Sequence, residues 1–541
     1  MRQLAFIAFL SCVYSKEEIF IGGLFPLSRK SNDNDKDNSK IGLGILPAVE
    51  LAMEHVNSHR QILNKQTLRI TYNDSMCDMA VGTKLFFDMM NQPPEKLILF
   101  GAACSHVTGP IAETAYYWRI PQLSYADTHP ELSDRTRYSM FFRTIPSDLD
   151  YNPARVKLVK NFGWKRVGTI FQDASKGSSR FAYAHNLFVD LLEQAGVERQ
   201  IESFSTDPAP AIENLKKKDQ RIIIGNFDSE MARKVVCQAY KTNLYGVKYV
   251  WILLGDYPKN WWKKGTDGCL VEELEKVLQG YFSTDILPLS SEERKTISNI
   301  TAQEYSRLYS SSVSSSDYNE FSGYAYDGIW AIALALHKTL NEYGIVQSEL
   351  RNNSDLLLDA LNNTDFIGVT GDVQFRKGDR VGSILLQQMQ GGRLVKIGEY
   401  HANNDTLNLE APNSSSIIWP SLYIFLYHSL VLNFSFLIVR LSPFIHIENK
   451  QPRDRTRQRL HLQRVNLTIY AILCTISSIG IIIALVFLGI NIKFRNHRYE
   501  IIINGLHFLG KELGIYLWEG ISLFSHIDNQ FILLIYTVYN L

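Results

Sequence analysis

The chain has 541 residues, 45% of them hydrophobic and 21% charged, with a formal net charge of +1. That length is sufficient for two or three domains, and the near-neutral charge gives no reason to expect nucleic acid as a partner. The sequence contains no glycine-rich phosphate motif, no HExxH and no GxSxG, and its 13 histidines are scattered without ligand spacing. We therefore predict neither an enzyme, nor a metal site, nor a cofactor.

The amino-terminal stretch 1–15, MRQLAFIAFLSCVYS, has an early arginine, an apolar centre and small residues near its end. This pattern predicts a secretory signal peptide that is cleaved near Ser15. A short membrane anchor is the alternative interpretation.

Strand-like and helix-like segments alternate along the chain from residue 19 to residue 401. Apolar runs of strand length occur at 19–24, 68–72, 97–100, 121–125, 140–143, within 163–171, and at 221–227, 249–254 and 396–401. Helical spacing of apolar residues occurs at 45–56, 82–90, 109–118, 181–196, 231–240 and 321–340. This alternation predicts an α/β fold with parallel sheets, and because one sheet would be unusually large, we expect two similar lobes hinged about a cleft. Segments 366–375 and 382–390 are expected to pair antiparallel.

The stretch Lys96–Pro130 contains the clearest single unit, a strand, a helix and a second strand. The first strand ends in Gly101-Ala102-Ala103, and small residues at that point allow a ligand to approach the backbone. The following helix has free N–H groups at its start, which favour a carboxylate or phosphate. A plain connection without a ligand is the alternative.

Four of the six cysteines lie in the region expected to be exported: Cys77, Cys104, Cys237 and Cys269. Cys12 belongs to the signal peptide and Cys474 to a later apolar run. Four cysteines allow three pairings; the sequential one closes the two shortest loops, and each bridge would contribute about 3 kcal/mol. Free buried thiols are the alternative. Sequons that predict N-glycosylation stand at Asn73, Asn299, Asn352, Asn362, Asn404, Asn413, Asn433 and Asn466.

Two uncharged apolar runs follow, Ile417–Val439 with 23 residues and Leu467–Ile492 with 26. As helices they would be about 34 and 39 Å long, which exceeds the roughly 30 Å hydrocarbon core of a membrane. The basic stretch QPRDRTRQRLHLQR separates them and KFRNHR follows the second, so the positive-inside rule leaves the orientation ambiguous.

Several segments of the sequence resemble a known family. They are FFRTIPSD, WKRVGTIFQD, SFSTDP, ARKVVCQAY, GVKYVWIL, LPLSSEERKTIS, GYAYDGIW and FIGVTGDVQFRKGDRVG. Together they resemble the Venus-flytrap ectodomain of class C G-protein-coupled receptors, most closely that of the second subunit of metabotropic GABA (type B) receptors. The stretch LTIYAILCTISSIGIIIALVFLGINIKFRNHR is similar to the first membrane helix and first cytoplasmic loop of these receptors.

The resemblance implies a domain plan. A bilobed, type I periplasmic-binding-protein-like ectodomain is expected at 16–410, followed by a divergent stalk, a membrane helix and part of the seven-helix domain. Lobe one would take roughly 16–150 and 275–345, lobe two roughly 151–274 and 346–401, the stalk 411–465, the helix 467–492 and the remainder 493–541. The run Ile417–Val439 has no counterpart in the family and is interpreted as an insertion. An extra spanning helix, which would place 440–465 inside the cell, is the alternative.

The resemblance also implies site residues. The four exported cysteines would pair sequentially, Cys77 with Cys104 and Cys237 with Cys269. Positions that hold GABA in the first subunit carry His106, Thr128, Ile145 and Asp228 here, and the family's glutamate is lost near Phe321. A zwitterion needs donors for its carboxylate and an anion for its ammonium, so this cleft resembles that of the subunit that does not bind GABA. A different ligand in the cleft is the alternative.

The function that the resemblance implies is that of a plasma-membrane receptor subunit with an extracellular ectodomain. It would form a heterodimer with GABA type B receptor subunit 1, support activation of that partner and, with a full membrane domain, signal through a heterotrimeric G protein. The expected contact is the lobe-one surface near Ala112–Trp118, where Tyr116 and Tyr117 are candidates for the partner and Trp118 for the core or the partner. The alternatives are a single-pass or shed module that sequesters the partner, a GABA-binding first-type subunit, and an enzyme-linked receptor, for whose intracellular domains the sequence leaves no room.

Overall fold

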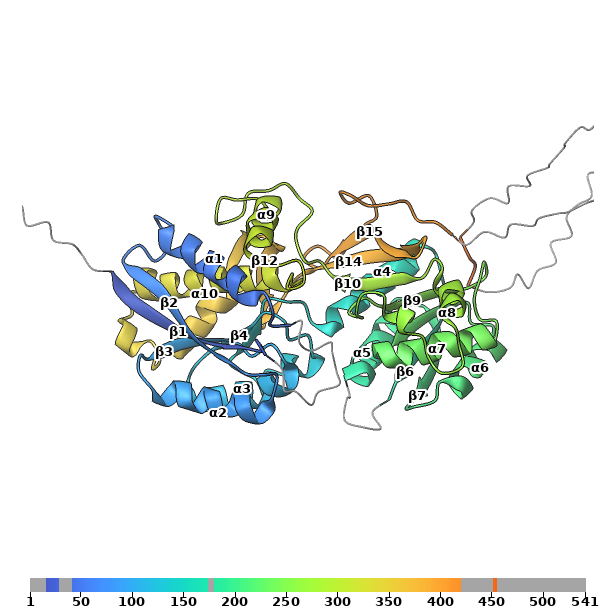
Figure 1. Ribbon diagram of the computed structural model, residues 1–541, viewed down its shortest axis with the longest axis horizontal. Coiled ribbons are helices and arrows are strands. Elements are labelled where there is room, and N and C mark those ends of the chain that lie inside the picture. The colour runs from blue at the N-terminus through green and yellow to red at the C-terminus, as the bar shows by residue number, and fades with distance from the viewer. Residues whose placement is uncertain (1–15, 29–40, 174–179, 420–450, 455–541) are drawn as a thin grey trace, which may run out of the picture. The chain divides into compact units, whose positions relative to one another are not determined.

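The computed structural model describes four parts of the chain: residues 16–28, 41–173, 180–419 and 451–454. The predicted signal peptide, the apolar run 467–492 and the part of Ile417–Val439 beyond Trp419 lie outside the described residues. Within the described ranges, no helix combines the length and the hydropathy needed to cross a membrane. Figure 1 draws the described α/β region in colour.

The described strands form two sheets, as the alternation of segments predicts. The first contains β1 (Glu17–Phe25), β2 (Gln66–Asp74), β3 (Lys96–Gly101), β4 (Gln122–Ser124), β5 (Phe141–Arg143), β11 (Asp365–Gly368), β12 (Gly371–Arg376) and β13 (Asp379–Arg380). The second contains β6 (Arg166–Gln172), β7 (Glu198–Phe204), β8 (Ile222–Asn226), β9 (Val250–Leu254), β10 (Phe282–Ile286), β14 (Ser383–Gln390), β15 (Arg393–His401) and β16 (Thr406–Asn408). We call the first sheet with its helices lobe one and the second with its helices lobe two.

The two sheets repeat one strand order. It runs β11-β12-β13-β5-β4-β3-β1-β2 in lobe one and β16-β15-β14-β10-β9-β8-β6-β7 in lobe two. In each sheet, five neighbouring strands run parallel. At one end of these five stand three strands from late in the chain, which pair antiparallel with one another. In such sheets, ligands bind outside the carboxyl ends of the strands, beside the point where the strand order reverses. That point lies between β1 and β3 in lobe one and between β6 and β8 in lobe two.

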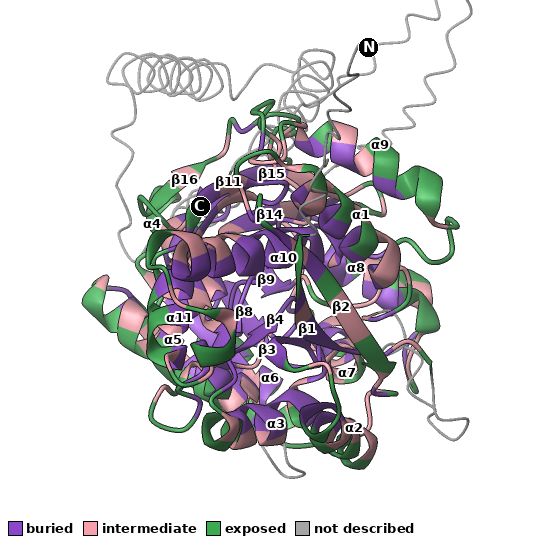
Figure 2. Cartoon of the chain, turned by 90° about the vertical axis from the view of Figure 1, so that its left-hand side faces the viewer, coloured by how far each residue is buried: buried purple, intermediate pink, exposed green. Residues whose placement is uncertain are grey.

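Helices cover both faces of the sheet in lobe one. They are α1 (Ile45–Ser58), α2 (Met79–Asn91), α3 (Ser105–Trp118), α9 (Ala302–Ser312), α10 (Ser322–His337) and α11 (Ser354–Asn362). Figure 1 shows α1 and α10 on one face of the sheet and α2 and α3 on the other. Helix α10 is apolar around most of its circumference, so it lies in the core and is purple in Figure 2, whereas the outer strand β2 has four residues of intermediate burial and three exposed residues among its nine.

Lobe two has the helices α4 (Tyr151–Asn161), α5 (Arg180–Gln194), α6 (Ala209–Lys217), α7 (Ser229–Lys241) and α8 (Val271–Leu278). Its core includes the indoles of Trp251, Trp261 and Trp262. Disulfides join Cys77 to Cys104 in lobe one and Cys237 to Cys269 in lobe two, which is the sequential pairing that the resemblance implies.

The lobe boundaries predicted from the sequence need correction. Strand β10 belongs to lobe two, because it pairs parallel with β9, so the second crossing between lobes comes after Ile286. Residues 365–380 belong to lobe one, because β13 pairs with β5. The antiparallel pairing expected between 366–375 and 382–390 is therefore wrong: β12 pairs with β11 and β13, and β14 pairs with β10 and β15.

Candidate functional site

The cleft residues expected from the sequence are engaged in local structure. The ring Nε2 of His106 lies 2.8 Å from the carbonyl oxygen of Cys77, so this exposed side chain is tied to the disulfide loop. Thr128 is half-buried, and its carbonyl accepts from the amide of Asp148 at 2.9 Å. Ile145 is fully buried in the apolar core of lobe one.

Asp228, the lobe-two member of that set, caps a helix. Its carboxylate accepts from the amide of Met231 at 2.8 Å at the start of α7, and its own amide donates to Gln172 Oε1 at 3.0 Å. An aspartate at this position satisfies one of the free N–H groups of the helix start. The structure thus gives Asp228 a local role in lobe two.

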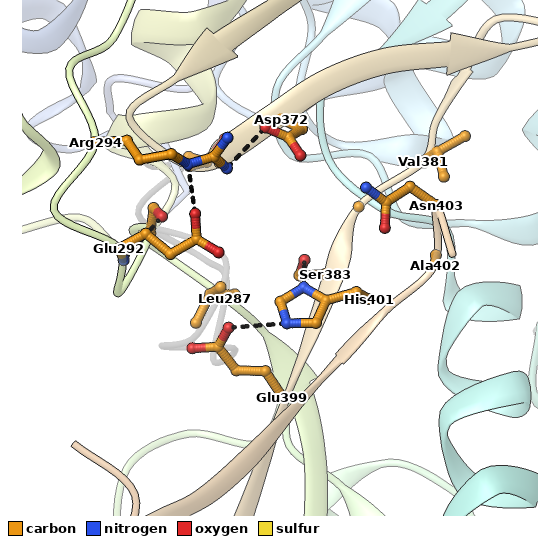
Figure 3. A pocket seen from close by; sticks show the side chains of 14 residues that line it. Leu287, Glu292, Arg294, Asp372, Val381, Ser383, Glu399, His401, Ala402 and Asn403 are labelled. Atoms are coloured by element: carbon orange, nitrogen blue, oxygen red, sulfur yellow. Dashed lines mark hydrogen bonds and ion pairs between the residues drawn. The ribbon is translucent and has the colours of Figure 1, made fainter. Parts of the chain in front are cut away.

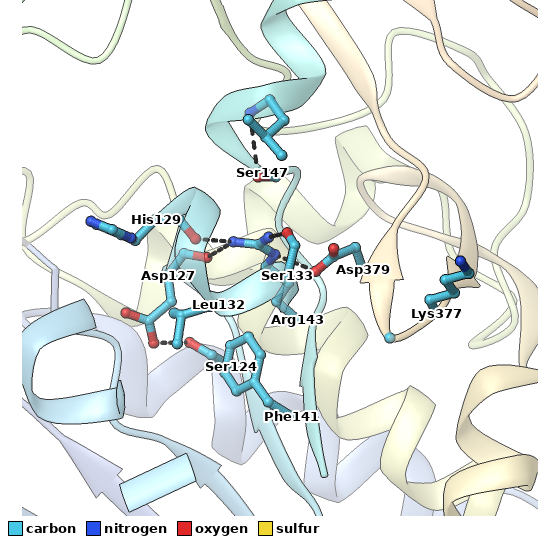
Figure 4. Close-up of polar contacts among 12 residues, drawn as sticks. Ser124, Asp127, His129, Leu132, Ser133, Phe141, Arg143, Ser147, Lys377 and Asp379 are labelled. Atoms are coloured by element: carbon cyan, nitrogen blue, oxygen red, sulfur yellow. Dashed lines mark hydrogen bonds and ion pairs between the residues drawn. The ribbon is translucent and has the colours of Figure 1, made fainter. Parts of the chain in front are cut away.

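Near the carboxyl ends of the lobe-one strands, the buried carboxylate of Asp127 accepts hydrogen bonds from three hydroxyl groups. Asp127 follows β4 and is 0% exposed. Three hydroxyls donate to its carboxylate: Ser105 Oγ at 3.0 Å, Thr108 Oγ1 at 2.6 Å and Ser124 Oγ at 2.6 Å. Burial raises the pKa of Asp127 above its ordinary value, and the hydroxyl donors lower it in part. Figure 4 shows the Ser124 contact beside the loop that follows β4.

The side chain of Arg143 anchors the loop 127–133, which follows β4. Its fully buried guanidinium donates to the carbonyls of Asp127 and His129, at 3.0 and 2.9 Å, and to Ser133 Oγ at 2.5 Å. Its Nε lies 2.7 Å from Asp379 Oδ1 on β13, as Figure 4 shows. One arginine therefore connects β5, the 127–133 loop and the late strand β13.

Lobe two carries its charges differently. Arg180 at the start of α5 contacts two carboxylates, Asp256 Oδ2 at 2.6 Å and Asp148 Oδ2 at 3.7 Å. Arg155 on α4 is buried and donates to Asn226 Oδ1 at 2.5 Å and to Thr284 Oγ1 at 3.0 Å. Its Nη2 has no hydrogen-bond partner among the described residues, and burial lowers the pKa of Arg155 to about 10.

Acidic groups gather around these arginines. Burial, together with the nearby charges of Glu320 and Asp256, raises the pKa of Asp285 to about 8. Burial also raises the pKa of Asp256, while Arg180 lowers it in part. At neutral pH a carboxyl group with a pKa of about 8 is mostly protonated, so Asp285 adds little negative charge beside these arginines.

A small pocket lies where the second and third crossings between the lobes pass each other. It has a volume of about 30 Å³ and is lined by Leu287 and Gly382 from the crossings, by Ser383 from β14 and by Glu399 and His401 from β15. Figure 3 shows His401 facing Glu399, which also accepts from Lys396 at 2.5 Å. A space of this size can hold an ordered water molecule beside the polar side chains of Ser383, Glu399 and His401.

The candidate partner surface on α3 is exposed. Tyr116 is 58% and Tyr117 83% exposed, and their rings contact each other edge to face. Trp118 is half-buried and packs against Phe86 of α2, so it belongs to the core side of the helix. Exposed apolar side chains of α2 and the preceding loop, Met76, Met79 and Phe87, are 39–50% exposed in the same lobe.

The candidate glycosylation sites are mostly open to solvent. Asn362 is half-buried and its Oδ1 accepts from the amide of Gly378, whereas five others are exposed: Asn73, Asn299, Asn352, Asn404 and Asn413. Asn433 and Asn466 lie outside the described residues. Whether any of the six carries a glycan stays a prediction.

Four charged residues that lie near the strand ends and helix starts of the two lobes were not identified from the sequence: Asp127, Arg155, Arg180 and Asp285. Asp127 and Asp285 stand at or just after the carboxyl ends of strands, and that position was the available signal. Arg155 lies within α4 and Arg180 opens α5, and neither belongs to a recognisable motif. Among the described residues no group of His, Cys, Asp and Glu is arranged to hold a metal ion.

The chain is similar in sequence to a known protein family and to several characterised proteins. The family described as "Receptor family ligand binding region" matches residues 44–392. The human gamma-aminobutyric acid type B receptor subunit 2 is 37% identical over 95% of this chain and 52% of its own length. Subunit 1 from Mus musculus is 34% identical over 90% and 47%, and subunit 2 from Caenorhabditis elegans 30% identical over 84% and 50%.

The chain thus spans about half the length of the curated relatives it matches, and those relatives are receptor subunits rather than enzymes. The family match covers most of both lobes, including the strand ends described above. This chain therefore belongs to the receptor family that has this ligand-binding region, and within it to the GABA type B receptor family.

Proposed function

We propose that this protein is the subunit of a heterodimeric GABA type B receptor that does not itself bind GABA and that supports activation of its partner. The observation that carries the proposal is the engagement of the lobe-one hydroxyls by Asp127. Serine and threonine hydroxyls at strand ends are the natural donors for a ligand carboxylate. Here a resident carboxylate already occupies them.

Two further cleft positions, Ile145 and Asp228, also support a subunit that does not bind GABA. Ile145 has no polar side-chain atom, and the Asp228 carboxylate is directed to the start of α7. A GABA carboxylate would have to displace Asp127 from three hydrogen bonds and then lie beside it. Like charges at such separations repel strongly when they are buried, so binding is unfavourable.

A subunit without its own agonist can still act on a receptor. If it binds the closed form of its partner better than the open form, it shifts the partner toward closure. A coupling free energy of about 1.4 kcal/mol changes agonist affinity tenfold. Tyr116 and Tyr117 on α3 supply exposed aromatic side chains of the kind that dominate such interfaces. We place the ectodomain outside the plasma membrane, with G-protein coupling through the membrane domain of this receptor family.

Co-purification with a first-type GABA type B receptor subunit tests the proposal. Tyr117→Ala removes an 83% exposed ring, and we expect it to weaken association at least tenfold while the ectodomain stays folded. Tyr183→Ala is the matched control, because Tyr183 is an equally large, 46% exposed side chain on α5 of lobe two. Retained pairing in the Tyr117 variant, or equal loss in both variants, would contradict the proposed lobe-one interface; absence of pairing in the wild type would contradict the proposed heterodimer.

A further inference from the structure

Five exposed lysines of lobe two lie at the edge of the sheet where its parallel strands begin. Three stand at the end of α6, one ends α7 and one precedes β9: Lys216, Lys217, Lys218, Lys241 and Lys248. Strands β6, β8 and β9 pair parallel, so their starts share this edge, and the cleft lies at the opposite, carboxyl ends of the strands. We call these five residues the basic edge.

The side chain of Lys216 connects the segments that form the basic edge. Its Nζ donates to the carbonyl of Asn243 at 2.9 Å, two residues beyond Lys241. The same Nζ donates to the hydroxyl of Tyr249, the neighbour of Lys248, at 3.3 Å. Helices α6 and α7 lie side by side in lobe two, as Figure 1 shows. The lysines of these three segments therefore belong to one surface.

The start of β6 borders this surface on its other side. Arg166 Nη2 donates to the carbonyl of Lys218 at 2.8 Å, and Arg166 Nε lies 3.5 Å from Glu198. The carboxylate of Asp219 lies 3.1 Å from Nε of Arg221, which precedes β8. Both carboxylates beside the basic edge thus face an arginine, and neither forms an ion pair with its lysines in the described part of the chain.

Few carboxylates neutralise the basic edge itself. Lys217 lies 3.9 Å from Glu213, an exposed pair of small energetic value, and among the described residues no ion pair within 4.0 Å involves the other four lysines. Cations in the last turns of α6 and α7 favour the helix dipoles, but Lys218 follows its helix and Lys248 precedes a strand. Positive charge therefore accumulates here, although the whole chain has a net charge of only +1.

We propose that the basic edge binds a linear sulfated polysaccharide. Sulfate groups are permanently charged, and clusters of lysine are the surfaces that attract such polyanions. The inference rests on the extracellular location proposed above. Anionic lipids are concentrated in the cytoplasmic leaflet, so a polyanion of the extracellular space is the complementary partner. An extended chain of repeated sulfates fits lysines that come from three separate segments, and it leaves the cleft and α3 free.

Binding of the full chain to immobilised heparin, after purification in a non-ionic detergent, tests the inference. The edge variant retains Lys216, whose amine has a structural contact, and combines Lys217→Gln, Lys218→Gln and Lys248→Gln. The control variant removes the same charge from three exposed lysines between β9 and α8, and combines Lys259→Gln, Lys263→Gln and Lys264→Gln. At about 0.15 M salt we expect the affinity to fall at least tenfold in the edge variant and less than twofold in the control.

Two further measurements identify the chemistry of the contact. The affinity should fall as the salt concentration rises, and less steeply in the edge variant, because fewer counterions are released. Heparin from which the sulfates have been removed should not compete. In the wild type, heparin should also protect the basic edge from acetylation, measured by mass spectrometry, and leave the three control lysines reactive. This protection requires no variant, so it decides the question even if a variant fails to fold.

The outcomes separate this inference from the proposed function. Equal loss of affinity in the two variants, unprotected lysines at the basic edge, or a wild type that does not bind heparin would overturn the inference. Binding to phosphatidylserine vesicles in place of heparin would also overturn it, because the partner would then be an anionic membrane. Pairing with a first-type subunit should be unchanged in the edge variant. A wild type that binds heparin without pairing contradicts only the proposed function, and one that pairs without binding heparin contradicts only this inference.

Discussion

Lobe one and lobe two share a strand order but differ in how they neutralise charge at the strand ends. In lobe one, Asp127 is buried and receives three hydroxyl hydrogen bonds, and Arg143 connects its own strand β5 to the 127–133 loop and to β13. In lobe two, Arg155 keeps one guanidinium nitrogen without a partner among the described residues, and Asp285 faces other acids. Equal backbone topology therefore does not imply equal chemistry in the cleft, because the loops after the strands supply the charged groups.

The largest expected effect comes from the most deeply buried charge pair of lobe one. Asp327 on α10 is 3.9 Å from Arg380 Nη1 and accepts from the amides of Val369 and Thr370, with both side chains at most 1% exposed. Asp327→Ala leaves Arg380 buried without its anion, so we expect a loss of about 3–5 kcal/mol in the free energy of unfolding. Urea denaturation of the ectodomain measures it, with the nearly isosteric Asp327→Asn as a control that should lose less. A loss below about 1 kcal/mol would show that lobe one does not depend on this pair.

A smaller loss is expected at the strand ends of lobe one. Asp127→Ala removes the acceptor of two buried hydroxyls, Thr108 and Ser124, and of the half-buried hydroxyl of Ser105, which should cost about 1–3 kcal/mol. Thr128→Ala is the control, because its half-buried neighbouring side chain should change stability by less than about 0.5 kcal/mol. If the two variants unfold alike, the Asp127 network is not the stabilising feature of this loop.

The third prediction uses pH to examine lobe two. The folded pKa of Asp285 is about 8, above its ordinary value, so the folded protein holds a proton that the unfolded chain releases between about pH 4 and 8. The contribution of this group to stability is therefore greatest below about pH 4 and is lost as the pH rises through 8. Asp285→Asn should therefore match the stability of the wild type at about pH 4 and below. Its stability advantage over the wild type should grow between about pH 4 and pH 8, by at most about 1.4 kcal/mol for each pH unit. An equal pH dependence in both proteins would contradict the assigned shift.

The sequence predicts the local elements well and the assignment of strands to sheets poorly. The βαβ unit from Lys96 appears as β3, α3 and β4, since apolar spacing is a local property. Strand β10 and the segment 365–380 were given to the wrong lobes, because strand partners are chosen by contacts far apart in sequence. The apolar pattern of such short strands does not determine which of the two sheets they join.

The candidate site shows the same division between local and distant information. The resemblance placed Ile145 and Asp228 at cleft positions, and the structure adds that one is in the core and the other caps a helix. The Asp127 network joins residues from the β3–α3 and β4 loops, and only the folded chain brings them together. The amide of Lys165 donates a hydrogen bond to the carboxylate of Asp454, nearly 300 residues further along the sequence, and no local pattern predicts this contact.

Isothermal titration of GABA into the purified ectodomain, residues 16–456, tests the central claim most directly. The account predicts no heat beyond dilution up to millimolar GABA, because Asp127 occupies the lobe-one donors. A melting curve on the same sample shows that the protein is folded. Saturable binding at one GABA per chain with micromolar affinity, lost in a Ser124→Ala variant that still folds, would contradict the account.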